Sequence, residues 1–225
     1  GSYTYHYRYT LGASVRFDGS DVFGVAKKYR YLPLYSVSGL WRVSEEKFMK
    51  PLTWINDFRL RASYGLQGNI DKSTSPYLIG VIDKTSILGT SETVINLGLE
   101  IAFLNDRIRF SADYYNRKSS DLIGIRMLPL ETGFASTTIN WASMKNDGWE
   151  LSLNTRNIVT KNFNWTTSLN LGFNDNKIIN ESVAQNSTYP SRQGHPVGAL
   201  FAYKTAGLDN DGYPLFVAAD GSKVT

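Results

Sequence analysis

The amino-acid sequence predicts an all-β fold built from antiparallel up-and-down strands. Three observations support this prediction: apolar and polar residues alternate over long segments, aromatic residues stand near the ends of the apolar runs, and the links between segments differ regularly in length. The chain has 225 residues, of which 13% are aromatic, with 19 glycines and no cysteine. This length is sufficient to bury a core as one large β domain or as two smaller ones.

Seven segments alternate apolar and polar residues with a period of two, the pattern of a β-strand with one apolar face. The first covers residues 3–17, where tyrosine, leucine, alanine, valine and phenylalanine take every second position, and we expect one strand there. The other six segments are residues 31–43, 58–64, 95–103, 107–115, 149–156 and 163–174.

The links between these segments alternate in length. Those over residues 18–30, 65–93 and 128–140 are long, and those over residues 104–106 and 157–162 are short. A medium link, residues 44–57, has room for one helical turn before Pro51. An up-and-down sheet with two unlike ends gives this alternation, and outer-membrane barrels have short periplasmic turns and longer extracellular loops.

Two kinds of β protein fit the alternation. A soluble β-sandwich buries each apolar face in its core. A membrane barrel turns the same face to lipid, needs strands of only about 9 to 11 residues, and carries aromatic girdles at both interfaces. No apolar run approaches the roughly 18 residues of a membrane-spanning helix.

After Tyr114 the apolar positions become odd-numbered, at Ile123, Ile125 and Met127, which predicts either a bulge or a strand that has risen clear of the membrane.

The sequence gives little support for an enzyme, a metal site or a nucleic-acid-binding surface. The absence of cysteine excludes disulfides and thiol chemistry, and His6 and His195 are the only histidines. The 24 basic and 20 acidic residues form no block of like charge. Residues 208–214, LDNDGYP, invite a calcium-loop interpretation, but Gly212 comes one step too early for an EF-hand, so we expect a turn. We therefore predict no catalytic residues, no metal and no cofactor.

Charged residues in the middle of the polar faces suit either solvent or a water-filled lumen. We expect these to line the lumen if the sheet is a barrel wall: Arg59, Arg61, Glu100, Arg107, Arg109, Asp113 and Glu150. Aromatic residues in the long links are candidates for ligand stacking or for contact with a partner protein: Phe23, Tyr29, Tyr77 and Phe134.

Several stretches resemble the SusC/RagA family of TonB-dependent outer-membrane transporters from Bacteroidetes-type bacteria. They are RFDGSDVFG (16–24), YLPLYSVSGLWRVSEEKF (31–48), RLRASYGLQGN (59–69), INLGLEIAFLNDRIRFSADYYNRKSSDLI (95–123), NDGWELSLNT (146–155) and GHPVGALFAYKTAGLDNDGYPLF (194–216). They occur in family order over nearly the whole chain. The resemblance therefore favours a large transmembrane β-barrel, of which residues 1–225 would form an interior part, with the plug domain and the remaining strands elsewhere.

The resemblance also implies a function. Such transporters import large nutrients, oligosaccharides or peptides, across the bacterial outer membrane with energy from TonB and with a SusD-like surface lipoprotein as a lid. The lumen-lining residues would then contact either the substrate or the plug. A soluble glycan-binding β-sandwich and a passive porin or adhesin barrel are the alternatives.

Overall fold

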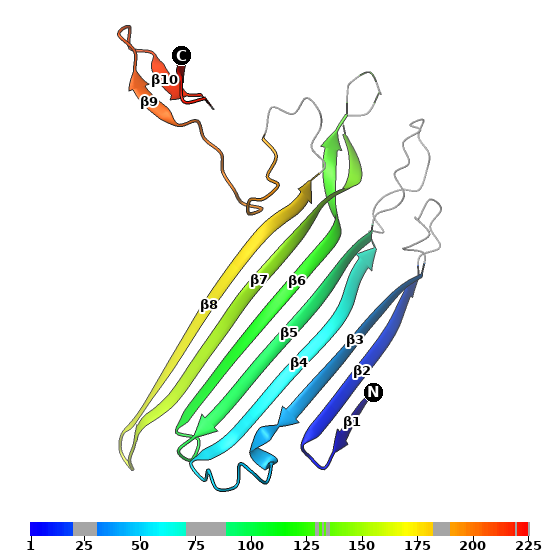
Figure 1. Ribbon diagram of the computed structural model, residues 1–225, viewed down its shortest axis with the longest axis vertical. Helices are drawn as coiled ribbons and strands as arrows, with labels where there is room; N and C mark the ends of the chain where they lie inside the picture. Colours follow the sequence, from blue (N-terminus) through cyan, green and yellow to red (C-terminus); the bar gives the residue numbers. More distant parts are fainter. Residues whose placement is uncertain are drawn as a thin grey trace.

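A computed structural model describes residues 1–19, 31–70, 89–128, 131, 133, 136–181, 190–218 and 220–224. Eight strands form one antiparallel sheet in which each strand pairs with its neighbours in the sequence (Figure 1). The strands are β1 (Ser2–Tyr5), β2 (Tyr9–Gly19), β3 (Tyr31–Arg42), β4 (Ile55–Ile70), β5 (Gly89–Phe103), β6 (Ile108–Met127), β7 (Ser136–Val159) and β8 (Asn164–Glu181). This confirms the predicted all-β, up-and-down arrangement. The sheet is open, because β1 and β8 do not pair with each other.

The two ends of the sheet differ as the sequence predicted. One end carries the links over residues 6–8, 43–54, 104–107 and 160–163, and we call it the short-link end. The link between β3 and β4 contains the 3-10 helix η1 (Val43–Glu45), the helical turn expected before Pro51. The links at the other end, the long-link end, lie mostly outside the described residues.

The tyrosine-rich start of the chain is a hairpin, and the prediction of one strand over residues 3–17 is wrong. The chain reverses after Tyr5, whose carbonyl accepts a hydrogen bond from the Arg8 amide at 3.0 Å. Tyr5 lies opposite Tyr9 in the resulting pair of strands. The turn uses positive φ values of 48° at His6 and 56° at Tyr7. Glycine, asparagine and aspartate favour such turns, and none stands here, so no residue of the turn indicated the reversal.

The change of apolar phase after Tyr114 is a bulge. Along β6, the next residue after Ser119 that has a register partner on β7 is Leu122, and the register shifts between these two residues. Asp121, inside this irregular stretch, has a φ of 58°. An extra residue in one strand moves the following side chains to the opposite face, which explains why the apolar positions become odd-numbered.

One face of the sheet is apolar and uncovered. Leu11, Phe17, Leu97, Leu169 and Phe173 lie on it with between 48% and 70% of their surface exposed. Among the described residues only seven hydrophobic side chains are buried, and no second layer packs on the sheet. A soluble sandwich would cover this face. We call it the outward face.

The apolar band on the outward face crosses the strands obliquely. The middle of the band is Ala13 on β2 and Leu169 on β8. Following the register partners from Ala13 across the sheet ends at Asp175 on β8, which is six residues beyond Leu169. Six strand-to-strand steps separate β2 from β8, so the band shifts by one residue per strand. With a rise of about 3.3 Å per residue and about 4.8 Å between strands, this shift corresponds to a tilt of roughly 35°. Barrel strands in outer membranes tilt by about 35–45°.

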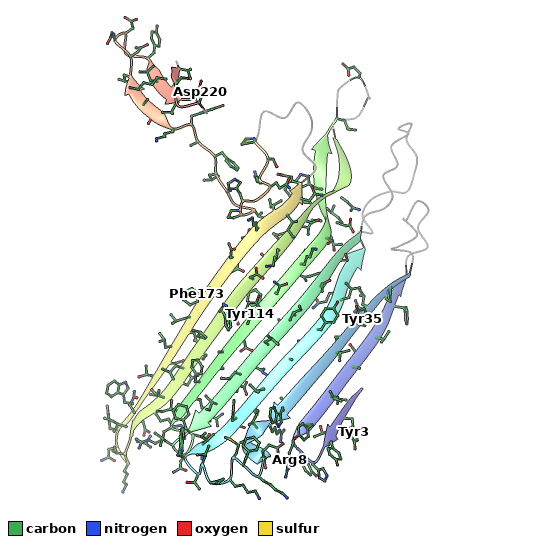
Figure 2. The ribbon with its side chains drawn as sticks, in the orientation of Figure 1. Tyr3, Arg8, Tyr35, Tyr114, Phe173 and Asp220 are labelled. Carbon is green, nitrogen blue, oxygen red and sulfur yellow. The ribbon has the colours of Figure 1, made fainter. Side chains whose placement is uncertain are left out.

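With this stagger, the aromatic side chains of the outward face fall into two rows. The rows are six residues apart on β3 (Trp41 and Tyr35) and eight apart on β8 (Trp165 and Phe173), or about 16–22 Å along the normal to a membrane at this tilt. Figure 2 shows Tyr35, Tyr114 and Phe173 at nearly the same height on three different strands. The row near the short-link end contains Tyr9, Trp41, Phe58, Phe103 and Trp165, and the upper aromatic row contains Phe17, Tyr35, Tyr64, Tyr114, Trp149 and Phe173.

A small second sheet follows the large one. It consists of β9 (Thr205–Leu208), β10 (Pro214–Val217) and β11 (Lys223–Val224), beyond the long-link end of β8 (Figure 1). The expected turn joins β9 to β10: Asp209 accepts hydrogen bonds from the amides of Asp211 and Tyr213 at 2.9 and 2.7 Å. The described part of the chain has no helix of the length and apolarity needed to cross a membrane.

Candidate functional site

Charged side chains gather on the polar face of β4, β5 and β6. Arg61 lies at their centre, with Nη2 3.0 Å from Asp113 Oδ1 and 3.3 Å from Glu100 Oε1. One guanidinium therefore joins three strands by ion pairs. The predicted lumen-lining residues Arg61, Glu100 and Asp113 are brought together here.

Gly98 makes this contact possible. It is the register partner of both Arg61 and Asp113, so it lies on β5 between the two charged residues. A Cβ atom at Gly98 would lie 2.5 Å from Asp113 Oδ1 and 3.0 Å from Arg61 Nε. A Cβ here would make these two side chains shift, so glycine allows the ion pair to lie flat on the strand.

Arg59 extends the same network towards the short-link end. Its guanidinium contacts Asp57 through two nitrogens, with Nε to Oδ1 at 2.9 Å and Nη2 to Oδ2 at 2.7 Å. A longer contact of 3.8 Å joins Arg59 to Glu100. These side chains are between 23% and 43% exposed, so each pair contributes only about 0.2–1 kcal/mol to stability. The network mainly fixes the positions of the charges on this face.

Glu150 differs from the other carboxylates of this face. It is the register partner of Asp113 on one side and of Gly172 on the other. It is exposed, and among the described residues it has no ion-pair partner. Nothing lies within 4 Å of the position that a Cβ at Gly172 would take, so Glu150 has open space beside it. This carboxylate is therefore available to an incoming cation or hydrogen-bond donor.

The two remaining predicted residues lie apart from this network, at the short-link end. Arg109 pairs with Asp106 at 3.2 Å. Arg107 donates to the backbone carbonyls of Arg156 and Asn157 and so ties the start of β6 to the end of β7. Sequence periodicity placed both arginines on the polar face but gave no sign of these local partners.

A second side chain that reaches across a glycine was not predicted from the sequence. Tyr115 of β6 lies across Gly148 of β7, and its hydroxyl donates to Asn174 Oδ1 of β8 at 3.0 Å. A Cβ at Gly148 would come within 2.3 to 2.6 Å of the Tyr115 ring. The available signal was a glycine on the polar face of a strand, in register with a long polar side chain.

Glu46 forms a third cluster, at the short-link end. Its carboxylate accepts hydrogen bonds from the Tyr9 hydroxyl, from Trp41 Nε1 at 3.2 Å and from Arg8 Nη1 at 3.3 Å. The hydrogen bond from Tyr9, followed by the one from Trp41, holds the pKa of Glu46 below its ordinary value, and the Arg8 charge acts in the same direction. The cluster anchors two aromatic rings of the outward face to the β3–β4 link.

The polar face shows the features of a positioned charge network, and no catalytic group stands out in it. Among the described residues no three histidine, aspartate or glutamate side chains gather as a metal site. The loop aromatics Phe23, Tyr29, Tyr77 and Phe134 lie outside the described residues, so their role in ligand or partner contact stays a prediction.

Comparison with known protein families gives a match over almost the whole chain. Residues 1–217 match the family described as "TonB dependent receptor-like, beta-barrel". The chain belongs to this family. The TonB-dependent receptor barrel explains the open sheet, its oblique apolar band and its polar opposite face, and it excludes the alternative of a soluble β-sandwich.

Curated relatives of this TonB-dependent receptor segment point the same way. It is 37% identical over 198 residues to TonB-dependent receptor P26 of Formosa agariphila, covering 79% of this chain and 20% of that protein. It is 30% identical over 214 residues to TonB-dependent receptor SusC of Bacteroides thetaiotaomicron, covering 84% of this chain and 21% of that protein. The chain thus spans about a fifth of these relatives.

Solved structures agree with this assignment. The RagAB peptide importer in the "closed-closed" state superposes with a TM-score of 0.74 at 26% identity, covering 99% of this chain and 27% of that chain. The "open-open" state gives the same TM-score at 25% identity. The resemblance to SusC and RagA is therefore confirmed. TonB-dependent receptors of this kind are outer-membrane receptors and transporters and are not a family of enzymes.

Proposed function

We propose that this chain forms part of the barrel wall of an active transporter in the bacterial outer membrane. The observation that carries the proposal is the division of one sheet into two unlike faces. One face presents an apolar band between two aromatic rows, staggered by one residue per strand, and the other presents the charge network around Arg61. The first suits lipid and the second suits a polar lumen.

The transporter is proposed to import large nutrients, oligosaccharides or peptides, with TonB-derived energy. The support is membership of the TonB-dependent receptor family together with the similarity to SusC and to a structure described as a peptide importer. A SusD-like surface lipoprotein is the proposed partner at the long-link end, which would be the extracellular mouth. TonB would act through the plug domain, and outer-membrane lipid would surround the outward face.

Within this wall, Glu150 is the proposed contact for substrate or plug. Arg61 and Asp113 neutralise each other, whereas Glu150 is exposed beside the open space over Gly172. Arg59, Arg61, Glu100 and Asp113 would form the fixed polar lining around it. Arg107 and Arg109 would line the periplasmic side of the lumen, because their hydrogen-bond and ion-pair partners lie at the short-link end.

The test is uptake by cells that carry the full-length transporter in place of the chromosomal copy. Cells would be supplied with fluorescent oligosaccharides and fluorescent peptides, with TonB present and with TonB deleted. We expect uptake of one class that disappears without TonB, and co-purification of a SusD-like lipoprotein with the transporter. Uptake that persists without TonB would support the passive porin or adhesin alternative instead.

Glu150→Gln supplies the residue-level arm of the test. It removes the exposed charge without changing the size of the side chain, so it should alter uptake while the protein level in the outer membrane stays unchanged. Arg61→Gln in parallel disturbs the internal ion pairs. Unchanged uptake in Glu150→Gln would remove this residue from the proposed contact.

A further inference from the structure

Three lysines lie side by side on the outward face of β6, β7 and β8. Lys118 is the register partner of Lys145, which in turn is the register partner of Lys177. All three are exposed. Neighbouring strands are about 4.8 Å apart, so the three stems leave the sheet within a stretch of roughly 10 Å. We call this group the lysine row.

The lysine row lies just beyond the upper aromatic row. Along each of these strands it stands four residues beyond an aromatic side chain, Tyr114, Trp149 or Phe173. Four residues at the tilt of these strands correspond to about 11 Å along the membrane normal. The aromatic row marks the edge of the hydrocarbon, and headgroups occupy the next 5 to 8 Å or so. Lysine stems reach several ångströms, so the ammonium groups lie within reach of lipid phosphates.

In the described part of the chain, the lysine row has three positive charges but only two carboxylates beside it, Asp147 and Asp175, which are register partners of each other. Lys145 Nζ lies 2.6 Å from Asp147 Oδ2, in the register row between the lysines and the aromatics. Among the described residues, Lys118 and Lys177 have no ion-pair partner. Like charges directly opposite each other on paired strands are destabilising. An anion that binds across the row would remove the part of this repulsion that Asp147 and Asp175 leave uncompensated.

We propose that the lysine row binds phosphate groups of a phosphorylated glycolipid in the outer leaflet of the outer membrane. Phosphate oxygens accept charge-assisted hydrogen bonds from several ammonium groups at once. The inference rests on the orientation of the outward face towards lipid in the proposed function, and it is independent of what the transporter imports.

The apolar surface below the lysine row favours a lipid over free phosphate. A trough of about 640 Å³ opens on the outward face, where small residues lie between large ones. Gly39, Ala62 and Ala112 are the small residues among those that line it, and Tyr114 and Trp149 border it on the side of the lysine row. A glycolipid held by its phosphate on these strands can lay an acyl chain past the two rings and into the trough.

The experiment measures binding of diphosphoryl lipid A to the full-length transporter in detergent, by native mass spectrometry or fluorescent-lipid titration. The combined variant Lys118→Gln, Lys145→Gln and Lys177→Gln should weaken binding by roughly tenfold or more, because it removes several charge-assisted hydrogen bonds. The matched control is Lys47→Gln, Lys50→Gln and Lys161→Gln, which makes the same charge change at the short-link end. This control should bind as the unmodified protein does.

Four further measurements keep the proposal falsifiable. Replacing the same three lysines by arginine should preserve binding and shows that the site tolerates substitution. Lipid A without phosphates should bind the unmodified protein as weakly as diphosphoryl lipid A binds the glutamine variant. Equal binding by the glutamine variant and its control would overturn the proposal, as would competition by inorganic phosphate at the same concentration as the lipid. Nutrient uptake by the same variants should be normal, so a failure here is distinguishable from a failure of the transport proposal.

Discussion

Arg61 on β4 reaches across Gly98 on β5 to Asp113 on β6, with Nη2 3.0 Å from Oδ1. The pair therefore spans two strand-to-strand steps, which ordinary cross-strand neighbours do not. A glycine at the crossing point is the condition for this reach, since a Cβ would occupy the space of the carboxylate oxygen. The same relationship recurs in Tyr115, Gly148 and Asn174, so glycines of the polar face act as gaps over which longer side chains lie.

Gly98→Ala should separate Arg61 from Asp113. We expect a loss of about 1 kcal/mol or less in stability, because exposed ion pairs contribute about 0.2–1 kcal/mol each. The apparent unfolding midpoint of the full-length protein in detergent measures the effect. In an Asp113→Ala background the same alanine should cost less, because the carboxylate oxygen is absent and the Arg61 side chain, no longer held by it, can move away from the Cβ. Equal costs in the two backgrounds would contradict this account.

Gly172→Ala is the matched control for this substitution. Gly172 is in the same register row, two strands further along the sheet from Asp113. A Cβ there meets nothing within 4 Å. The variant should unfold at the same temperature as the unmodified protein, so any general cost of alanine on this face would become visible.

Gly148→Ala should have a larger effect than Gly98→Ala. The Tyr115 ring is bulky and stiff, and a Cβ at Gly148 would come within 2.6 Å of three of its atoms. We expect a cost of about 1–3 kcal/mol from overpacking, together with loss of the hydrogen bond to Asn174. Tyr115→Phe alone should cost only the hydrogen bond, about 0.5–1.5 kcal/mol. Unfolding midpoints of these variants and of Tyr115→Ala with Gly148→Ala provide the measurement, and the double variant should show that the alanine is tolerated once the ring is gone.

Periodicity predicted most of the fold because a half-exposed strand needs apolar residues on one face only. The segment over residues 31–43 therefore closely matches β3 (Tyr31–Arg42). The same signal predicted shorter segments than β6 and β7 because it ends where the apolar band ends, whereas the backbone pairing continues to Met127 and Ser136. The hairpin at Tyr5 was not predicted because the alternation of apolar and polar residues continues unbroken through the turn at His6 and Tyr7.

The candidate site was predictable only as a set of polar-face positions. Alternation placed Arg61 and Asp113 on that face, but their contact depends on the register of three strands with Gly98 between them. The lysine row was not predictable for the same reason. Lys118 and Lys177 are far apart in the sequence and meet only through the pairing of β6, β7 and β8. Register depends on how distant segments of the chain pair, and a single sequence does not reveal it.

Acid should weaken the short-link end through Glu46. Its pKa is lowered in the folded protein, chiefly by the hydrogen bond from Tyr9, so the ionised form stabilises the fold above the ordinary pKa of 4.5. This contribution falls as the pH drops from that value through the lowered one, where the carboxylate takes up a proton. Glu46→Gln should reduce the unfolding midpoint at pH 7 and show a smaller further decrease on acidification to pH 3.5. The neighbouring Glu45→Gln should follow the unmodified protein at both pH values.

Arginine substitutions on the two faces of β5 should distinguish a lipid-facing side from a water-facing side. Leu97 is 49% exposed in the apolar band, and Asn96, the preceding residue, lies on the opposite face. Leu97→Arg places a charge in hydrocarbon and should cost about 2–4 kcal/mol if the position is near the bilayer midplane. Asn96→Arg keeps its charge on the polar face and should change stability by less than 1 kcal/mol or so, as surface substitutions generally do. Folding of the full-length variants into phosphatidylcholine vesicles, followed by the heat-dependent shift in gel mobility, measures both. Equal yields for the two variants would mean that the apolar face of β5 does not meet lipid.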